Sequence, residues 1–90
     1  MRIVLTYDVD RDHTAIKQAC LRGGFSDCAP MKSGPQKLLP NTTLFGEFDS
    51  PSDAVTTFRQ LARGASRFVV IEKVFATACG AFILGSDKEC

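Results

Sequence analysis

The chain has 90 residues, of which 44% are hydrophobic and 23% are charged, and its formal net charge is +1. This length suits one domain, and the composition is typical of a folded protein and excludes a disordered one. Eleven basic and ten acidic residues exclude a strongly basic surface that would bind nucleic acid as a whole, but they are compatible with a local basic patch. We therefore expect a single domain over residues 1–90, with a core at 1–75 and a C-terminal extension at 76–90.

The size and the apolar pattern also bear on assembly and location. A domain this small buries only roughly two-thirds of its unfolded surface, so pairing into a homodimer is a useful source of stability. The first apolar run ends in acids, and no run is long enough to cross a bilayer. The four cysteines form no C-x-x-C pair. This spacing favours the interpretation that they are small apolar residues of a protein in a reducing compartment, and not zinc ligands. We expect a cytoplasmic homodimer with no membrane partner.

The first predicted element is a strand within residues 2–10, which ends in two acids, Asp8 and Asp10. Alternation along the strand places Tyr7 on the apolar face and Asp8 on the opposite face. Acids at the end of a strand either cap the next helix or bind a hard cation. The pattern leaves both interpretations open.

A first helix follows the acids. Asp10 or Asp12 is placed to cap it, and Gly23-Gly24 is placed to end it, since glycine tolerates the positive φ of a helix C-terminus. Ile16 and Cys20 are four residues apart and give this helix an apolar inner face.

The next part of the chain is a loop followed by a strand. Residues 25–41 are rich in Pro, Ser, Gly and Lys, which predicts a long loop with a short edge strand near Lys37–Leu39 or Cys28–Lys32. Residues 42–49 then alternate between apolar and polar side chains, which predicts a clear strand.

The strongest local signal marks the start of a second helix. Ser50 is placed to cap it and Pro51 suits its first position, and the apolar stripe that follows ends at Gly64. A dense β-forming run at Arg67–Phe75 predicts another strand, and Ala81–Leu84 an additional short one.

The order of these elements predicts two successive β-α-β units. The right-handed crossover rule then places both helices on one face of an antiparallel sheet. This is the split β-α-β, or ferredoxin-like, arrangement of an α+β protein, here with an extra C-terminal strand.

Asp8 is the leading candidate for catalysis. The first strand of such a sheet is central, so we expect Asp8 near the middle of the molecule, where an unpaired carboxylate would be desolvated. If two subunits bring their Asp8 residues together, the like charges invite a divalent cation, and Mg²⁺ suits a site with one or two carboxylates. Asp10 is a second candidate ligand. Both acids equally suit capping of the turn or the positive end of the helix.

Other residues are candidates for contact with nucleic acid. Tyr7 could stack against a base, or fill the core with its hydroxyl hydrogen-bonded. Asn41, Thr42 and Thr43 could donate hydrogen bonds to phosphate, or serve a turn and an edge pairing. Arg11 is one of several basic residues in the N-terminal half that could follow a phosphate backbone, although solvated charges explain them as well.

The chain resembles the small CRISPR-associated proteins of the spacer-acquisition complex and their VapD-like and SinR-like relatives. The likeness covers about residues 1–75: a strand ending in Leu5-Thr6-Tyr7-Asp8, a helix ending in glycine, a Thr-rich strand leading to Phe45, a second helix, and a strand ending near Glu72. The resemblance implies a ferredoxin-like homodimer. Several members of the family are metal-dependent nucleases that use the Asp at the end of the first strand. The resemblance therefore implies this role for Asp8, which stands at the matching position.

The Pro-rich loop at residues 29–40 departs from that pattern, which has a clear second strand there. The family's C-terminal strand often pairs with the partner subunit, a role that would fall to Ala81–Leu84. Three functions stay open because such folds host many. They are a dimeric Mg²⁺-dependent nuclease acting on RNA or DNA in a defence or toxin–antitoxin system, a non-catalytic dimeric scaffold, and a regulatory domain that binds a small ligand.

Overall fold

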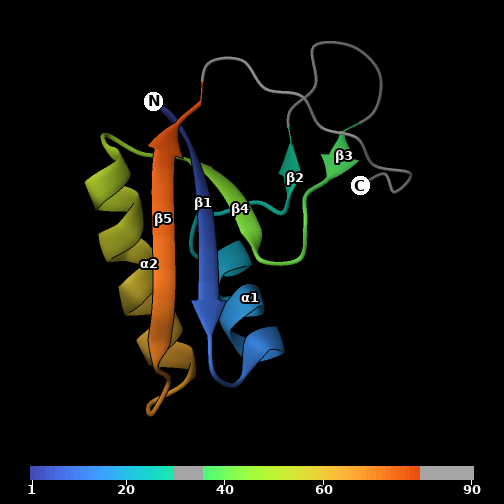
Figure 1. Cartoon of the computed structure of the whole chain (residues 1–90). Helices are drawn as coiled ribbons and strands as arrows, with labels where there is room; N and C mark the ends of the chain where they lie inside the picture. The colour runs from blue at the N-terminus through green and yellow to red at the C-terminus, as the bar shows by residue number, and fades with distance from the viewer. Residues whose placement is uncertain (30–35, 80–90) are drawn as a thin grey trace.

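The computed structural model describes residues 1–29 and 36–79, which form an α+β domain (Figure 1). An antiparallel sheet of three strands has β1 at its centre, between β4 and β5. A small hairpin of β2 and β3 lies apart from this sheet. In chain order the elements are β1 (Arg2–Val9), α1 (His13–Arg22), β2 (Cys28–Ala29), β3 (Lys37–Leu38), β4 (Thr43–Glu47), α2 (Pro51–Ala65) and β5 (Ile71–Ala78).

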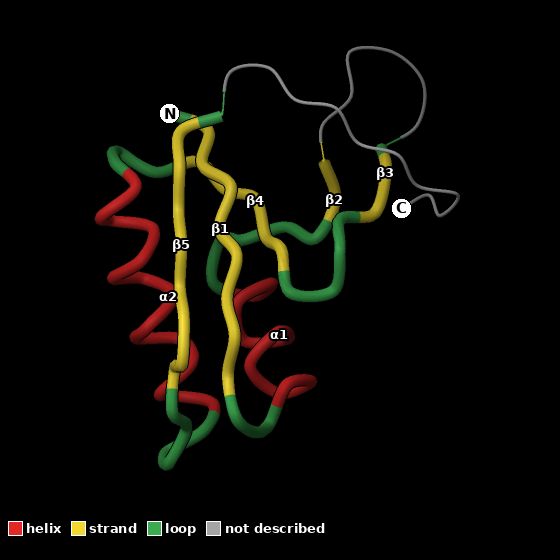
Figure 2. Tube along the Cα trace, in the orientation of Figure 1, coloured by secondary structure: helices red, strands yellow, loops and turns green. Residues whose placement is uncertain are grey.

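Both helices pack against one face of the sheet, and the main core lies between the helices and the sheet (Figure 2). The predicted alternation of β1 is confirmed, because every second side chain from Ile3 to Val9 is buried on this face. Phe58 of α2 is fully buried, and its ring lies 4.8 Å from that of Tyr7, centroid to centroid. Burial raises the pKa of the Cys20 thiol to about 11, so this cysteine stays protonated and acts as a small apolar residue, as the sequence predicts.

The start of α1 differs from the prediction that Asp10 or Asp12 caps it. Asp12 is the N-cap residue by position, but its side chain makes no capping hydrogen bond and its φ of 55° lies in the left-handed region. The Asp12 carboxylate instead accepts a 2.6 Å hydrogen bond from the hydroxyl of Ser66, which follows α2. The acid thus ties two distant segments together, which no local pattern could reveal.

The predicted start of α2 is confirmed. The Ser50 hydroxyl accepts a 3.1 Å hydrogen bond from the Asp53 backbone N–H, and Pro51 occupies the first turn, where its missing N–H costs nothing. The helix ends at Ala65, one residue beyond the predicted Gly64.

The two places predicted for a short edge strand pair with each other as the β2–β3 hairpin. Ala29, Leu39 and Phe45 form a second small core with half-buried Val4, so the hairpin covers part of the sheet face that the helices leave open. Cys28 in β2 is disulfide-bonded, so the prediction that the cysteines are small apolar residues of a reducing compartment is wrong at this position.

Strand β5 begins four residues later than predicted and runs beyond Phe75 to Ala78, so the sheet extends past the expected core boundary. Its start is set by β1: the Val70 N–H donates to the Asp10 carboxylate, and the Asp10 N–H donates to the Val70 carbonyl. The predicted strand at Ala81–Leu84 lies outside the described residues. No helix within residues 1–29 and 36–79 has the length and apolarity needed to cross a membrane.

Candidate functional site

The sheet face turned away from the helices carries the most unusual exposed side chains. The strand register places Lys73 of β5 opposite Asp8 of β1, and Phe75 opposite Thr6. All four are exposed, because the β2–β3 hairpin covers only the neighbouring part of the face. We call Thr6, Asp8, Lys73 and Phe75 the open patch.

Phe75 is the apolar centre of the open patch, and 64% of its surface is exposed. Burying a phenylalanine side chain stabilises a protein by about 1.5–3 kcal/mol, so an aromatic ring left in water on a flat sheet marks a surface that gains from being covered. No sequence pattern gave Phe75 a role. The signal that could have found it is an aromatic residue on the face of the strand opposite Val74 and Ala76, which are partly buried.

Asp8 lies on this open face and is exposed to solvent. The expectation that its carboxylate would be desolvated is wrong, because the helices cover only the opposite face of the central strand. Within the part of the chain that the structure describes, no hydrogen bond or ion pair holds this carboxylate. Its role as a metal ligand stays a prediction.

Asp10 and Arg11 form a pair of their own. The Arg11 guanidinium donates to one Asp10 carboxylate oxygen at 2.9 Å, and the Val70 N–H donates to the other at 2.8 Å. These hydrogen bonds, first from Arg11 and then from Val70, lower the pKa of the Asp10 carboxyl. Both oxygens of Asp10 therefore have a structural role, and Arg11 is engaged with a carboxylate rather than directed at a phosphate.

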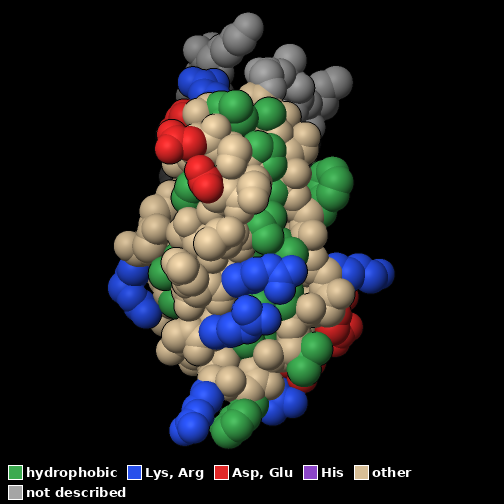
Figure 3. Space-filling view, turned by 90° about the vertical axis from the view of Figure 1, so that its left-hand side faces the viewer, with side chains coloured by type: hydrophobic (Ala, Val, Ile, Leu, Met, Phe, Trp, Pro, Cys, Tyr) green, Lys and Arg blue, Asp and Glu red, His purple; other side chains and the backbone are tan. Residues whose placement is uncertain are grey.

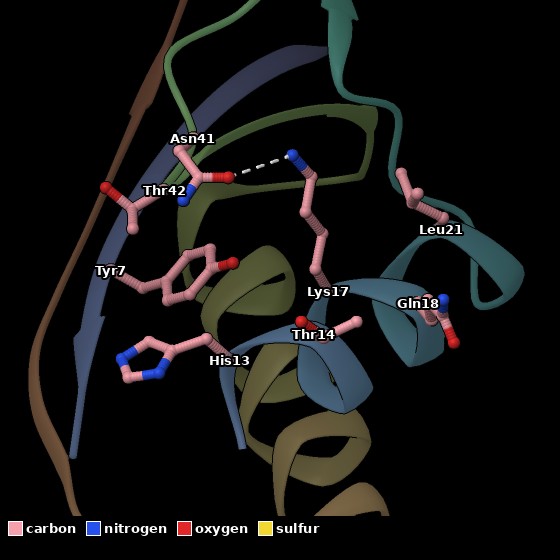
Figure 4. Close-up of a pocket in the computed structure, with 8 residues that line it drawn as sticks. All are labelled: Tyr7, His13, Thr14, Lys17, Gln18, Leu21, Asn41 and Thr42. Atoms are coloured by element: carbon pink, nitrogen blue, oxygen red, sulfur yellow. Dashed lines mark hydrogen bonds between the residues drawn. The ribbon is translucent and has the colours of Figure 1, made fainter. Parts of the chain in front are cut away.

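Tyr7 and Thr42 lie on the helix side of the sheet, where they line a cavity of about 200 Å³ between α1 and the start of β4 (Figure 4). Thr43 faces the other side, opposite Thr6 in the register of β1 and β4. The predicted nucleic-acid residues are thus divided between two faces. The cavity also contains Lys17 and Asn41. From the sequence, Asn41 suits a phosphate contact or a turn, and Lys17 suits a contact to a phosphate backbone or a solvated charge.

The basic side chains form no continuous patch on the side of the molecule where α2 and β5 lie. Basic and acidic side chains form separate groups there, with hydrophobic side chains between them (Figure 3). Among the described residues, no three His, Cys, Asp or Glu side chains gather as a metal-binding group.

Comparison with known proteins returned no match of any kind: no family model fits the chain, and neither curated proteins nor solved structures are significantly similar.

Proposed function

We propose that this chain is a homodimeric interaction protein with a ferredoxin-like fold, in which two subunits pack through their open patches. The observation that carries the proposal is the composition of the patch: an exposed aromatic ring beside one acid and one base. The role that follows is that of a non-catalytic scaffold. Its placement in a defence or toxin–antitoxin assembly rests on the family resemblance alone.

The patch is self-complementary under two-fold symmetry. A two-fold axis brings the same surface of both subunits together, so a group on the axis meets its own copy and a group away from the axis meets a different group of the partner. Rotation about an axis near Phe75 stacks the two rings centrally and places Asp8 opposite Lys73 of the partner subunit. Opposite charges around a buried aromatic centre are the arrangement that stabilises such an interface.

The order of the strands supports the ferredoxin-like part of the proposal. The strand order in the sheet is β5–β1–β4, and it continues beyond β4 at Ser26, which forms an isolated antiparallel bridge to Phe45 of that strand. Ser26 follows α1 in the chain, at the place of the fourth strand of a split β-α-β sheet. That strand would be reduced to one bridge here, with the β2–β3 hairpin folded over the sheet beside it.

The first test is self-association of the Phe75→Ala variant, measured by sedimentation velocity. Two rings are lost from one interface, so about 3–6 kcal/mol of burial disappears, and the dimer should weaken at least about 100-fold. Phe68→Ala is the matched control, because Phe68 is 71% exposed but precedes β5 and lies outside the patch. A wild-type monomer, or equal effects of the two variants, would contradict the proposal.

A second candidate, the Mg²⁺-dependent nuclease acting on RNA or DNA, is favoured by the unengaged Asp8 carboxylate. Asp8 is the only carboxylate among the four residues of the open patch, so the proposed metal site needs Asp8 from two subunits. Bound Mg²⁺ would supply a hydroxide and neutralise charge on a phosphodiester. The position of Lys73 opposite Asp8 opposes this candidate, because an ammonium group competes with a metal for the same carboxylate.

Cleavage of labelled single-stranded RNA and DNA tests this candidate. The nuclease interpretation requires cleavage that depends on Mg²⁺ and is lost in Asp8→Asn, while the fold and the dimer persist. Wild-type protein that dimerises without cleaving supports the scaffold. The cytoplasmic location stays a prediction, and the disulfide at Cys28 is atypical of a reducing compartment.

A further inference from the structure

The cavity between α1 and the start of β4 is separate from the open patch, since Tyr7 and Asp8 point to opposite faces of β1. Its volume of about 200 Å³ is below the range of drug-sized pockets, roughly 300–1,000 Å³. Seven of the eight described lining residues carry a hydroxyl, amide, imidazole or ammonium group, and Leu21 is the apolar one.

Tyr7 presents its hydroxyl to this cavity. The residue is only 5% exposed and its ring packs against Phe58, while Figure 4 shows the hydroxyl directed across the cavity toward Lys17. The hydroxyl has no hydrogen-bond partner among the described residues. Burial raises the pKa of Tyr7, so at neutral pH the group remains an O–H donor. None of the described residues has a buried side-chain oxygen or nitrogen without a partner, so the Tyr7 hydroxyl is accessible from the cavity and its O–H is available to an acceptor there.

Asn41 adds a second donor whose orientation follows from chemistry. The Lys17 ammonium lies 3.4 Å from the Asn41 side-chain oxygen, and an ammonium can only donate, so the amide oxygen must face Lys17. The amide NH₂ is therefore left for another partner, and Figure 4 shows it on the Tyr7 side of the amide. Hydroxyl, amide and ammonium donors thus surround one small space.

The charge balance of the cavity agrees with this donor set. Among the described lining residues, Lys17 is the only Lys or Arg, and none is Asp or Glu. The carboxylate of Asp27 lies 3.7 Å from the Lys17 ammonium and is not among the described lining residues, so Lys17 has a counter-charge outside the lining. The ammonium has three N–H donors, so one is left for a ligand beside those that face Asn41 and Asp27.

We propose that this cavity binds a small ligand through one oxyanion group, a phosphate monoester or a carboxylate, held by Lys17, Tyr7 and the amide of Asn41. The hydroxyls of Thr14 and Thr42 lie in the same lining and can complete the set of donors. This site does not depend on dimerisation or on Asp8, and it gives the protein a ligand-binding function beyond the scaffold role.

The test is a titration of the ¹⁵N-labelled full chain with inorganic phosphate, acetate, adenosine 5′-monophosphate and adenosine, followed by NMR. We expect shifts of the amide signals around Tyr7, Lys17 and Asn41 with the three anions. Adenosine should cause none. Lys17→Met should raise the dissociation constant at least about tenfold, because it removes a charge-assisted hydrogen bond, and Tyr7→Phe about fivefold.

Arg63→Met is the matched control, since it removes one exposed positive charge on α2 away from the cavity and should leave binding unchanged. Several results would overturn the proposal. These are no binding of any anion at millimolar concentrations, equal losses in Lys17→Met and Arg63→Met, or adenosine binding as tightly as its monophosphate. An RNA oligonucleotide that binds the cavity far more tightly than the mononucleotide would contradict a small ligand.

Discussion

Asp10 and Val70 are joined by two hydrogen bonds, one between their backbones at 3.2 Å and one from the Val70 N–H to the Asp10 carboxylate at 2.8 Å. The pair connects the end of β1 to the start of β5 across 60 residues of chain. The pair gives the Asp10 carboxylate a structural role at the end of β1.

The first prediction concerns the pH dependence of stability. Asp10 has a folded-state pKa below its ordinary value of 3.8, so its charge stabilises the fold above that pH, and this stabilisation is lost as the pH falls through the folded pKa. Asp10→Asn keeps an acceptor for Val70 but loses the charge facing Arg11. We expect a lower free energy of unfolding than in the wild type at neutral pH, with the difference vanishing in strong acid. Urea unfolding at several pH values measures it, and a difference independent of pH would contradict the assignment.

A second prediction separates the backbone of Asp12 from its side chain. Asparagine tolerates a left-handed φ and retains an acceptor for the Ser66 hydroxyl, so Asp12→Asn should be close to neutral. Asp12→Ala loses the acceptor and places a Cβ at positive φ, which should destabilise the protein by about 1–3 kcal/mol. Thermal unfolding of the two variants side by side is the measurement. Equal stabilities would show that this contact is unimportant.

The third prediction compares two phenylalanines. Phe58 is fully buried between α2 and β1, and Phe58→Ala should cost about 3–5 kcal/mol because it leaves a cavity in the core. Phe75→Ala should change the unfolding free energy of the monomer by less than about 0.5 kcal/mol, because its ring is in water. Denaturant unfolding at low protein concentration checks both values. A large loss in Phe75→Ala would mean that the ring stabilises the subunit itself.

A fourth prediction tests the cap of α2. Ser50→Ala removes the acceptor of the Asp53 N–H and should destabilise the protein by about 1 kcal/mol, whereas Ser52→Ala, an exposed serine in the same turn, should be neutral. Circular dichroism during heating is sufficient to compare them.

The sequence predicted those features that depend on neighbours along the chain. The alternation of β1 and the Ser50-Pro51 start of α2 are local patterns, and both are confirmed. The predicted start of β5 is wrong because Val70 is hydrogen-bonded to Asp10. The predicted cap of α1 is wrong because the Asp12 side chain is hydrogen-bonded to Ser66 instead. Such contacts join residues that are more than 50 positions apart, which no local pattern records.

The candidate site was predicted less well than the fold, for a geometric reason. The alternation of β1 correctly predicts that Tyr7 and Asp8 face opposite sides of the sheet, but it does not show which other residues lie beside each of them. The cavity and the open patch are therefore two separate surfaces. Phe75 and Asn41 belong to them through register and turn geometry, which only the folded chain defines.

The most direct measurement of the proposed interface is a charge exchange followed by sedimentation equilibrium. Asp8→Lys or Lys73→Asp alone places like charges across the two-fold axis and should weaken the dimer about tenfold or more. The double variant Asp8→Lys/Lys73→Asp restores opposite charges and should return the dissociation constant close to that of the wild type. If the double variant stays as weak as the single ones, or if Mg²⁺ and not the charge exchange controls the dimer, the interface we propose is wrong.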